Sequence, residues 1–274
     1  MTDIIKLMCI LAHPDDESLG TGGILAKYAA EGVETYLVTA THGERGWMGD
    51  EKDDPGPEAM RRLRTGELQA AAQVLGLREV YFLDYIDGEL DQADPAEAIG
   101  KIVTQLRRVR PQVVVTFDPF GSYGHPDHIA ISQFTQAAIV AAADPTYGSL
   151  NGDAAHESTP HRVAKLYYMA DSQELIDAYL ANIGDITMDV DGVERRARAW
   201  EDWAITTRID TALYARQVWQ AAGCHRSQLP EYDRLNQLSA EVFLKFWGCQ
   251  TFYRAFSLVN GGRRVEHDLF EGLR

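Results

Sequence analysis

Two short motifs concentrate histidines and acids, the side chains that most often bind a catalytic metal ion. The first, AHPDDE, contains His13, Asp15 and Asp16. His13 and Asp16 are three residues apart, so on a turn or a first helical turn both side chains can face one point. Asp15 and Asp16 are neighbours that point in different directions, so one acid can bind a metal while the other faces a substrate. The alternative is that Asp16 or Ser18 caps a following helix.

The second motif, GSYGHPDH, places His125 and His128 three residues apart at the start of an expected helix. Its glycines allow the backbone to fold tightly around a ligand. The alternative here is that Asp127 is an acid favoured by the helix dipole in the first turn. Two histidines and one carboxylate form a common catalytic metal set that leaves positions open for water and substrate. His13, Asp16 and His128 could form such a set, which suits iron(II) as well as zinc.

The elements that must position these motifs alternate between strands and helices. Apolar and β-branched runs predict strands at Lys6–Ala12, Glu34–Ala40, Glu79–Leu83, Val113–Phe117 and Lys165–Ala170. The helices expected between them span Thr21–Glu31, Glu58–Leu75, Pro95–Val109 and Pro126–Ala143. This order predicts an α/β fold with a Rossmann-like, mostly parallel sheet and helices on both faces. Ligands of such sheets bind beyond the carboxyl ends of the strands, and both motifs follow strand ends. Their placement favours one shared site.

The rest of the chain is less regular. Residues Pro145–Pro160 are rich in turn formers and predict a surface loop or an active-site flap. From about residue 172 to 274 we expect mostly helices, with a short hairpin near Ile186–Val193. We expect a single domain over residues 1–274, whose helical part either belongs to the main body or forms a small cap. The sequence does not reveal the roles of loops 46–57 and 145–160.

Composition excludes several classes of protein. The 274 residues carry a formal charge of -15, so a phosphate backbone is not attracted and nucleic acid is not an expected partner. The three cysteines form no CxxC pair, which is typical of a reducing, cytoplasmic location. The first residues resemble a buried strand and not a signal peptide, and no segment is as long as a membrane-spanning helix. The composition is compatible with a homo-oligomer.

The chain resembles the PIG-L/LmbE-like zinc-dependent N-deacetylases, on the residues AHPDDE, THGERG and GSYGHPDH. That family includes N-acetylglucosaminyl-phosphatidylinositol deacetylases and deacetylases of mycothiol and bacillithiol synthesis. The likeness continues in RTGELQAAAQVLGL, which contains Arg64, and more weakly in ITTRIDTALYARQVWQAAGCHRSQ, which contains His225. It spans most of the chain and is closest around the two motifs.

The resemblance implies a role for each matching residue. His13, Asp16 and His128 match the zinc ligands, and Asp15 matches the general base. His125 matches the histidine that stabilises the oxyanion or protonates the leaving amine. The other implied residues are Asp127, which would orient His125, Tyr123 near the oxyanion, Arg64 against the substrate, and His225 close to the metal pocket. His42, at the end of the second strand, either lines the pocket with these residues or is an ordinary loop histidine.

We therefore expect a Zn²⁺-dependent hydrolase, with Fe²⁺ as the other candidate ion. It would remove an N-acetyl or other acyl group from the amine of a small substrate, of an amino-sugar type such as an N-acetylglucosamine conjugate. The ion would activate a water and Asp15 would take its proton. Two alternatives remain: a metal-dependent hydrolase of another bond such as a phosphoester, and a non-catalytic carbohydrate-binding protein with a relic site. Released acetate would distinguish the first, and a function independent of metal would indicate the second.

Overall fold

The computed structural model describes residues 4–148, 159–190, 192–228, 238–262 and 264–274. A seven-stranded sheet with strand order β3-β2-β1-β4-β5-β9-β8 forms its centre. Five neighbouring strands are parallel: β3 (Glu79–Tyr85), β2 (Glu34–Thr41), β1 (Lys6–Leu11), β4 (Val113–Thr116) and β5 (Lys165–Met169). Antiparallel pairing then adds β9 (Cys249–Ser257) and β8 (Thr207–Asp210). The expected α/β fold with a mostly parallel sheet is confirmed.

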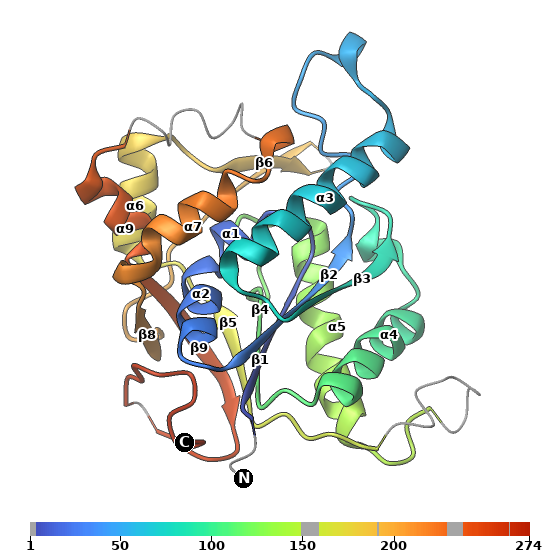
Figure 1. Ribbon diagram of the computed structural model, residues 1–274, viewed down its shortest axis with the longest axis vertical. Coiled ribbons are helices and arrows are strands. Elements are labelled where there is room, and N and C mark those ends of the chain that lie inside the picture. The colour runs from blue at the N-terminus through green and yellow to red at the C-terminus, as the bar shows by residue number, and fades with distance from the viewer. Residues whose placement is uncertain (1–3, 149–158, 191, 229–237, 263) are drawn as a thin grey trace.

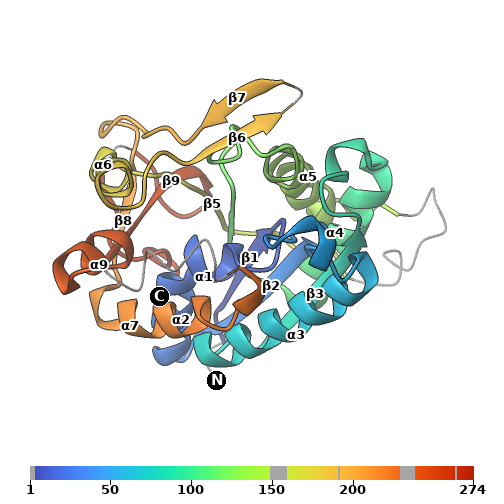
Figure 2. The same ribbon diagram turned by 90° about the horizontal axis from the view of Figure 1, so that it is seen from above.

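Helices cover both faces of this sheet (Figure 2). On one face lie α2 (Gly22–Ala30), α3 (Pro57–Leu75) and α7 (Ala215–Ala222), and on the other lie α4 (Pro95–Val109) and α5 (Pro126–Ala143). The short helix α1 (Asp16–Leu19) follows β1, and α6 (Gln173–Asn182) packs with α9 (Ala240–Trp247) near β8 and β9 (Figure 1). No helix in the described ranges is long and apolar enough to cross a membrane.

The sequence explains why the central strands are so well fixed. In β1 every residue after Lys6 is buried, and all four residues of β4 are buried. Strands that are covered on both faces favour continuous apolar runs, and such runs fix where each strand ends. The helices α3, α4 and α5 begin with proline in the first turn. In α4 the Asp94 carboxylate also accepts a hydrogen bond from the Ala96 N–H at 2.7 Å.

The part of the chain after residue 172 differs from the expectation of mostly helices. It does contain α6, α7 and α9, but β8 and β9 also join the main sheet, beside β5. The hairpin expected near Ile186–Val193 is present as β6 (Thr187–Val190) and β7 (Val193–Arg196), a separate two-stranded sheet. Most of the loop expected at 145–160 lies outside the described residues.

Candidate active site

The two motifs meet at the carboxyl edge of the parallel strands. His13 follows β1 after one residue, while His128 lies in the first turn of α5, which follows β4. The Nδ1 atom of His13 is 3.2 Å from Nε2 of His128, which is 3.5 Å from Oδ1 of Asp16. The third side of this triangle joins His13 to Asp16, and there the distance from Nδ1 to the other carboxylate oxygen, Oδ2, is 3.8 Å. The shared site predicted from strand ends is therefore formed.

This triangle fits a metal ion. Two ligand atoms that each lie about 2.0 to 2.1 Å from a tetrahedral zinc ion are about 3.3 Å apart, close to the distances between the three donor atoms. The donors are two imidazole nitrogens and a carboxylate, all on side chains that are mostly shielded from solvent. Three protein ligands leave a fourth position for water or substrate. The residues present thus suit a catalytic ion, although the same donors do not select zinc over iron(II).

Hydrogen bonds from the surrounding backbone hold two of the donors. Asp16 Oδ2 accepts hydrogen bonds from the backbone N–H groups of His13, at 2.8 Å, and Ala12, at 3.1 Å. Nδ1 of His128 is 3.3 Å from the carbonyl oxygen of Gly121, and the His128 ring stacks on Phe117 with centroids 3.8 Å apart. A histidine whose second nitrogen donates to a carbonyl presents its other nitrogen unprotonated, as a metal ligand must.

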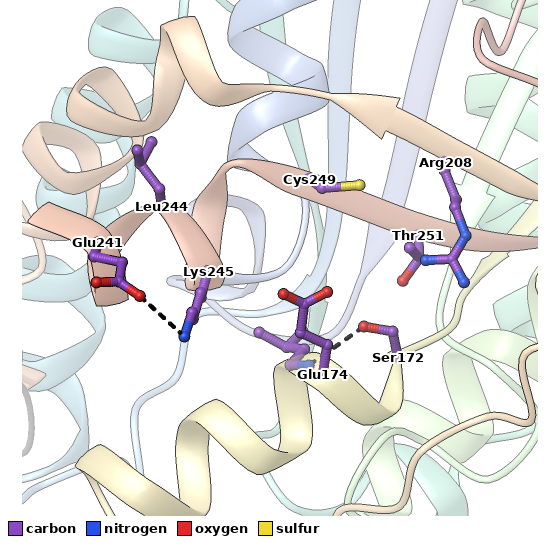
Figure 3. A pocket seen from close by; sticks show the side chains of 9 residues that line it. Ser172, Glu174, Arg208, Glu241, Leu244, Lys245, Cys249 and Thr251 are labelled. Carbon is purple, nitrogen blue, oxygen red and sulfur yellow. Dashed lines mark hydrogen bonds and ion pairs between the residues drawn. The ribbon is translucent and has the colours of Figure 1, made fainter.

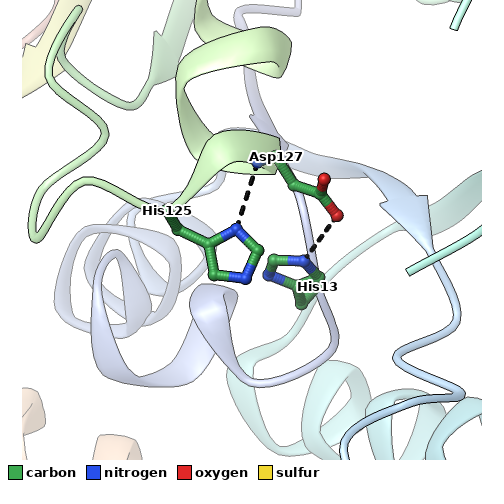
Figure 4. Close-up of side chains that lie close together, drawn as sticks. All are labelled: His13, His125 and Asp127. Carbon is green, nitrogen blue, oxygen red and sulfur yellow. Dashed lines mark hydrogen bonds and ion pairs between the residues drawn. The ribbon is translucent and has the colours of Figure 1, made fainter. Parts of the chain in front are cut away.

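Asp127 holds the third donor, His13, and also contacts His125. Its side chain is fully buried and its Oδ2 is 3.0 Å from Nε2 of His13. Figure 4 shows the two side chains pointing toward one another. The carboxylate also accepts hydrogen bonds from the backbone N–H groups of Gly88 and Leu90. The expectation that Asp127 orients His125 stays a prediction, since its carboxylate contacts His13 and not His125. Only its backbone N–H reaches His125, donating to Nδ1 at 3.1 Å.

These contacts make His13 basic when no metal is bound. Burial by itself lowers the pKa of His13, but hydrogen bonds to Asp127 and Asp87 outweigh it and raise the pKa to about 10. Burial raises the pKa of Asp16, against the opposing effect of charged His13. Both pKa values are raised, and the carboxylates around His13 give the site an excess of negative charge. A divalent cation would neutralise the same charge.

Asp15 lies beside the donor triangle in a strained backbone conformation. Its φ of 108° is unusual for a residue other than glycine, and such strain concentrates at functional sites. The two neighbouring acids have different partners, because Asp16 contacts His13 and His128 whereas Asp15 contacts Arg64. Oδ2 of Asp15 is 3.2 Å from the guanidinium of Arg64, a buried side chain that also donates to the carbonyl oxygens of Gly43 and Pro14. Arg64 therefore touches the predicted base, and its predicted contact with substrate stays a prediction.

His125 and Tyr123 belong to the glycine-rich loop before α5. Because His125 Nδ1 accepts the Asp127 N–H, a neutral His125 carries its proton on Nε2 and can donate it. Burial, with charged His13 nearby, lowers the pKa of His125 and so favours this neutral form. The Tyr123 ring lies edge-on to His128, with centroids 5.3 Å apart. Their predicted roles with the oxyanion are compatible with these positions and are not tested by them.

Two other histidines predicted at the site are held by their own partners. His42 has Nδ1 at 2.7 Å from Thr65 Oγ1 and Nε2 at 2.9 Å from Asp84 Oδ1, and stacks on Phe82. His225 is fully buried, with Nε2 at 2.8 Å from Glu17 Oε1. Direct contact of either ring with substrate stays a prediction.

Sequence reasoning missed two acids that contact these residues. Asp87 has Oδ1 at 3.2 Å from Nε2 of His13. It follows β3, so the rule that placed the motifs at strand ends applies to it as well. Glu17 is the last residue of AHPDDE, and its carboxylate accepts the Asp15 N–H at 2.9 Å. Its complete burial was not visible from the motif alone.

A pocket of about 240 Å³ lies elsewhere, between α6, α9, β8 and β9 (Figure 3). Side chains such as Glu174, Arg208 and Cys249 line it, and none of its lining residues is a predicted site residue.

Known proteins resemble this chain in sequence and in structure. The PIG-L family model, described as GlcNAc-PI de-N-acetylase, matches residues 8–139, which include both motifs. A 1D-myo-inositol 2-acetamido-2-deoxy-alpha-D-glucopyranoside deacetylase from Streptomyces avermitilis is 33% identical, over 98% of this chain and 97% of the relative.

Two solved structures share the fold at lower identity. N,N'-diacetylchitobiose deacetylase from Pyrococcus horikoshii is 21% identical with a TM-score of 0.68, covering 92% of this chain and 84% of its own. GalB, the 4-carboxy-2-hydroxymuconate hydratase from Pseudomonas putida KT2440, is 17% identical with a TM-score of 0.67, covering 94% and 99%. A deacetylase and a hydratase thus have this fold in common, so the fold alone does not define the reaction. Sequence identity along nearly the whole chain does define the family, and the chain belongs to the PIG-L family.

Proposed function

We propose that this protein is a zinc-dependent deacetylase that hydrolyses the N-acetyl group of an amino-sugar substrate. The observation that carries the proposal is the triangle of donor atoms from His13, Asp16 and His128, with the acid Asp15 beside it. The family and the relatives named as amino-sugar deacetylases support the reaction and the substrate class. By analogy with the Streptomyces relative, the substrate is a 2-acetamido-2-deoxy-glucopyranoside joined to a polar alcohol.

The three ligands would hold the ion, and the ion would polarise the acetyl carbonyl and lower the pKa of the attacking water. Asp15 accepts the proton of that water, and the Arg64 guanidinium, 3.2 Å from Oδ2 of Asp15, holds its carboxylate in place. His125 donates from Nε2–H to the developing oxyanion, a role that its backbone-fixed tautomer permits. Tyr123, on the same loop, is the second candidate donor. Proton delivery to the nitrogen releases acetate and the free amine.

The test begins with protein purified without added metal. Its metal content is measured, and amine and acetate release are then followed on a panel of N-acetylated sugars, with an aryl phosphate ester in parallel. Zinc at one equivalent together with acetate release would support the proposal. Phosphate release would favour the phosphoester alternative. Sugar binding without any product, in protein loaded with either zinc or iron(II), would favour the carbohydrate-binding alternative.

We further propose a cytoplasmic enzyme that is organised as one domain. All three cysteines have free thiols, which supports a reducing compartment. The pairing of β9 with β5 supports one domain, because it joins the C-terminal part of the chain to the central sheet. Proteolysis of the folded protein tests the domain assignment, and a stable fragment ending near residue 172 would contradict it.

A further inference from the structure

We propose that Glu17 and His225 form a buried pair that positions Asp15, with His225 acting through Glu17 and not on the substrate. The inference rests on the proposed function, since Asp15 is taken as the base. It assigns a positioning role to the histidine near the C-terminal end of α7, a role that the sequence motif CHRSQ does not reveal.

Glu17 contacts both Asp15 and His225. One oxygen, Oε2, accepts the backbone N–H of Asp15 at 2.9 Å, and the other, Oε1, is 2.8 Å from Nε2 of His225. Oε1 also accepts the hydroxyl of Ser18 at 2.5 Å. The side chains of Glu17 and His225 are both fully buried. A buried carboxylate with this many donors is held in one rotamer, so the Asp15 N–H that it accepts is held as well.

Asp15 needs this support because its backbone is strained. A non-glycine residue with a φ of 108° returns to an ordinary conformation unless its neighbours prevent it. The Arg64 guanidinium holds the carboxylate end of Asp15, while Glu17 holds its backbone N–H. Loss of either contact leaves the side chain with a wider range of positions, and small displacements of a catalytic group reduce the rate steeply.

The segment that carries His225 is itself anchored on the helix that carries Arg64. Ser227 donates from its backbone N–H and its hydroxyl to the Glu67 carboxylate on α3, at 2.8 and 2.7 Å. Gln228 donates to the carbonyl oxygen of Gly46 at 2.7 Å. Arg64 lies on α3, and the segment with His225, the partner of Glu17, is bound to α3. Both contacts that hold Asp15 are therefore connected to this helix.

The burial of His225 argues against a substrate contact. Its exposed fraction is 0%, and Nε2 is already used by Glu17. Nδ1 has no hydrogen-bond partner within the ranges the structure describes. Among the described residues, the His225 ring therefore makes a hydrogen bond to Glu17 alone.

The test compares two amide replacements of the histidine. In His225→Gln the amide nitrogen occupies the place of Nε2 and can still donate to Glu17, whereas in His225→Asn the shorter side chain cannot reach it. We expect His225→Asn to lower kcat on the order of 10- to 100-fold with KM and bound zinc unchanged, and His225→Gln to restore most of kcat. His161→Asn is the matched control and should keep the wild-type kcat. His161 precedes β5 and is also buried, but its ring contacts the carbonyl oxygen of Pro111, just before β4.

The outcomes distinguish failure of the positioning role from failure of the proposed function. If wild-type protein releases no amine from any substrate, the proposed function fails. If the wild type is active but both amide variants have its kcat, or if the Asn variant raises KM alone or loses zinc, the positioning role is overturned. Should His225→Asn not fold, as judged by its melting curve, Glu17→Gln provides the second variant. It replaces one acceptor oxygen by a donor and must lower kcat with zinc and KM retained.

Discussion

Nε2 of His13 lies 3.0 Å from the buried carboxylate of Asp127, although the backbone of Asp127 contacts a different histidine, His125. Asp127, in the first turn of α5, therefore contacts two imidazoles in different ways: its carboxylate accepts from His13, and its backbone N–H donates to His125. With Nε2–H directed to a carboxylate, His13 presents Nδ1 to the donor triangle, and with Nδ1 accepting an N–H, His125 presents Nε2–H. This division of roles leads to the first prediction.

Asp127→Asn should weaken zinc binding by about 10- to 100-fold, because an amide is a poorer acceptor for the His13 N–H. The free energy of unfolding should fall by about 1 to 3 kcal/mol, since one of the N–H groups of Gly88 and Leu90 then faces an amide nitrogen. A chelator competition and a denaturant titration measure the two effects. Unchanged zinc affinity would show that the contact between Asp127 and His13 does not tune the ligand.

Asp15→Asn should keep zinc and lose activity. The amide oxygen can still accept from Arg64, but the side chain cannot take a proton, so kcat should fall by about 10²- to 10⁴-fold. Metal analysis and steady-state kinetics on the same preparation check both statements. Asp177→Asn, on the exposed side of α6, is the control and should behave as wild type. Full activity with full zinc in Asp15→Asn would end the assignment of Asp15 as base.

Zinc affinity should depend strongly on pH. In the metal-free protein the pKa of His13 is raised to about 10, so at neutral pH the imidazole holds a proton that must leave before Nδ1 can bind zinc. Lower pH favours the protonated, metal-free form, and affinity should fall about tenfold for each pH unit. The slope should steepen in acid, because burial raises the pKa of Asp16 and adds a second competing proton. Chelator competition from pH 6 to 9 tests this, and a flat profile would refute it.

Gly43→Ala should destabilise the protein through the Arg64 side chain. Gly43 has a φ of 65°, and a Cβ there would overlap the guanidinium that holds Asp15. Gly32→Ala is the matched control, because Gly32 has a φ of 84° but nothing within 4 Å of an added Cβ. The control should lose only the backbone cost of about 1 to 2 kcal/mol and keep its kcat. Gly43→Ala should lose more stability and most of kcat; equal losses in the two variants would contradict the steric explanation.

The sequence predicts those features that depend on burial and on chain direction. Continuous apolar runs revealed β1 and β4, and the helices at Pro95–Val109 and Pro126–Ala143 have the expected bounds, because proline at the start and the loss of the apolar pattern at the end are local signals. The carboxyl ends of parallel strands lie at one edge of the sheet, so the sequence also predicted that the two motifs would lie close together.

Other features depend on directions that spacing does not encode. In β9 most residues are only partly buried, so its pattern does not stand out as a core strand, and its neighbour β8 has only four residues. The carboxylate of Asp127 could point to either histidine, and only the packing of the β3–α4 loop, with Gly88 and Leu90 as donors, directs it to His13.

The order of residues along the chain has a consequence for synthesis. His13, Asp16 and His128 all precede β5, whereas His225 follows β8 and precedes β9. A ribosome therefore makes the proposed zinc ligands well before it makes the histidine that supports Asp15, although a domain generally folds as a unit. On these assignments, the second support of Asp15 depends on the part of the chain that is made last.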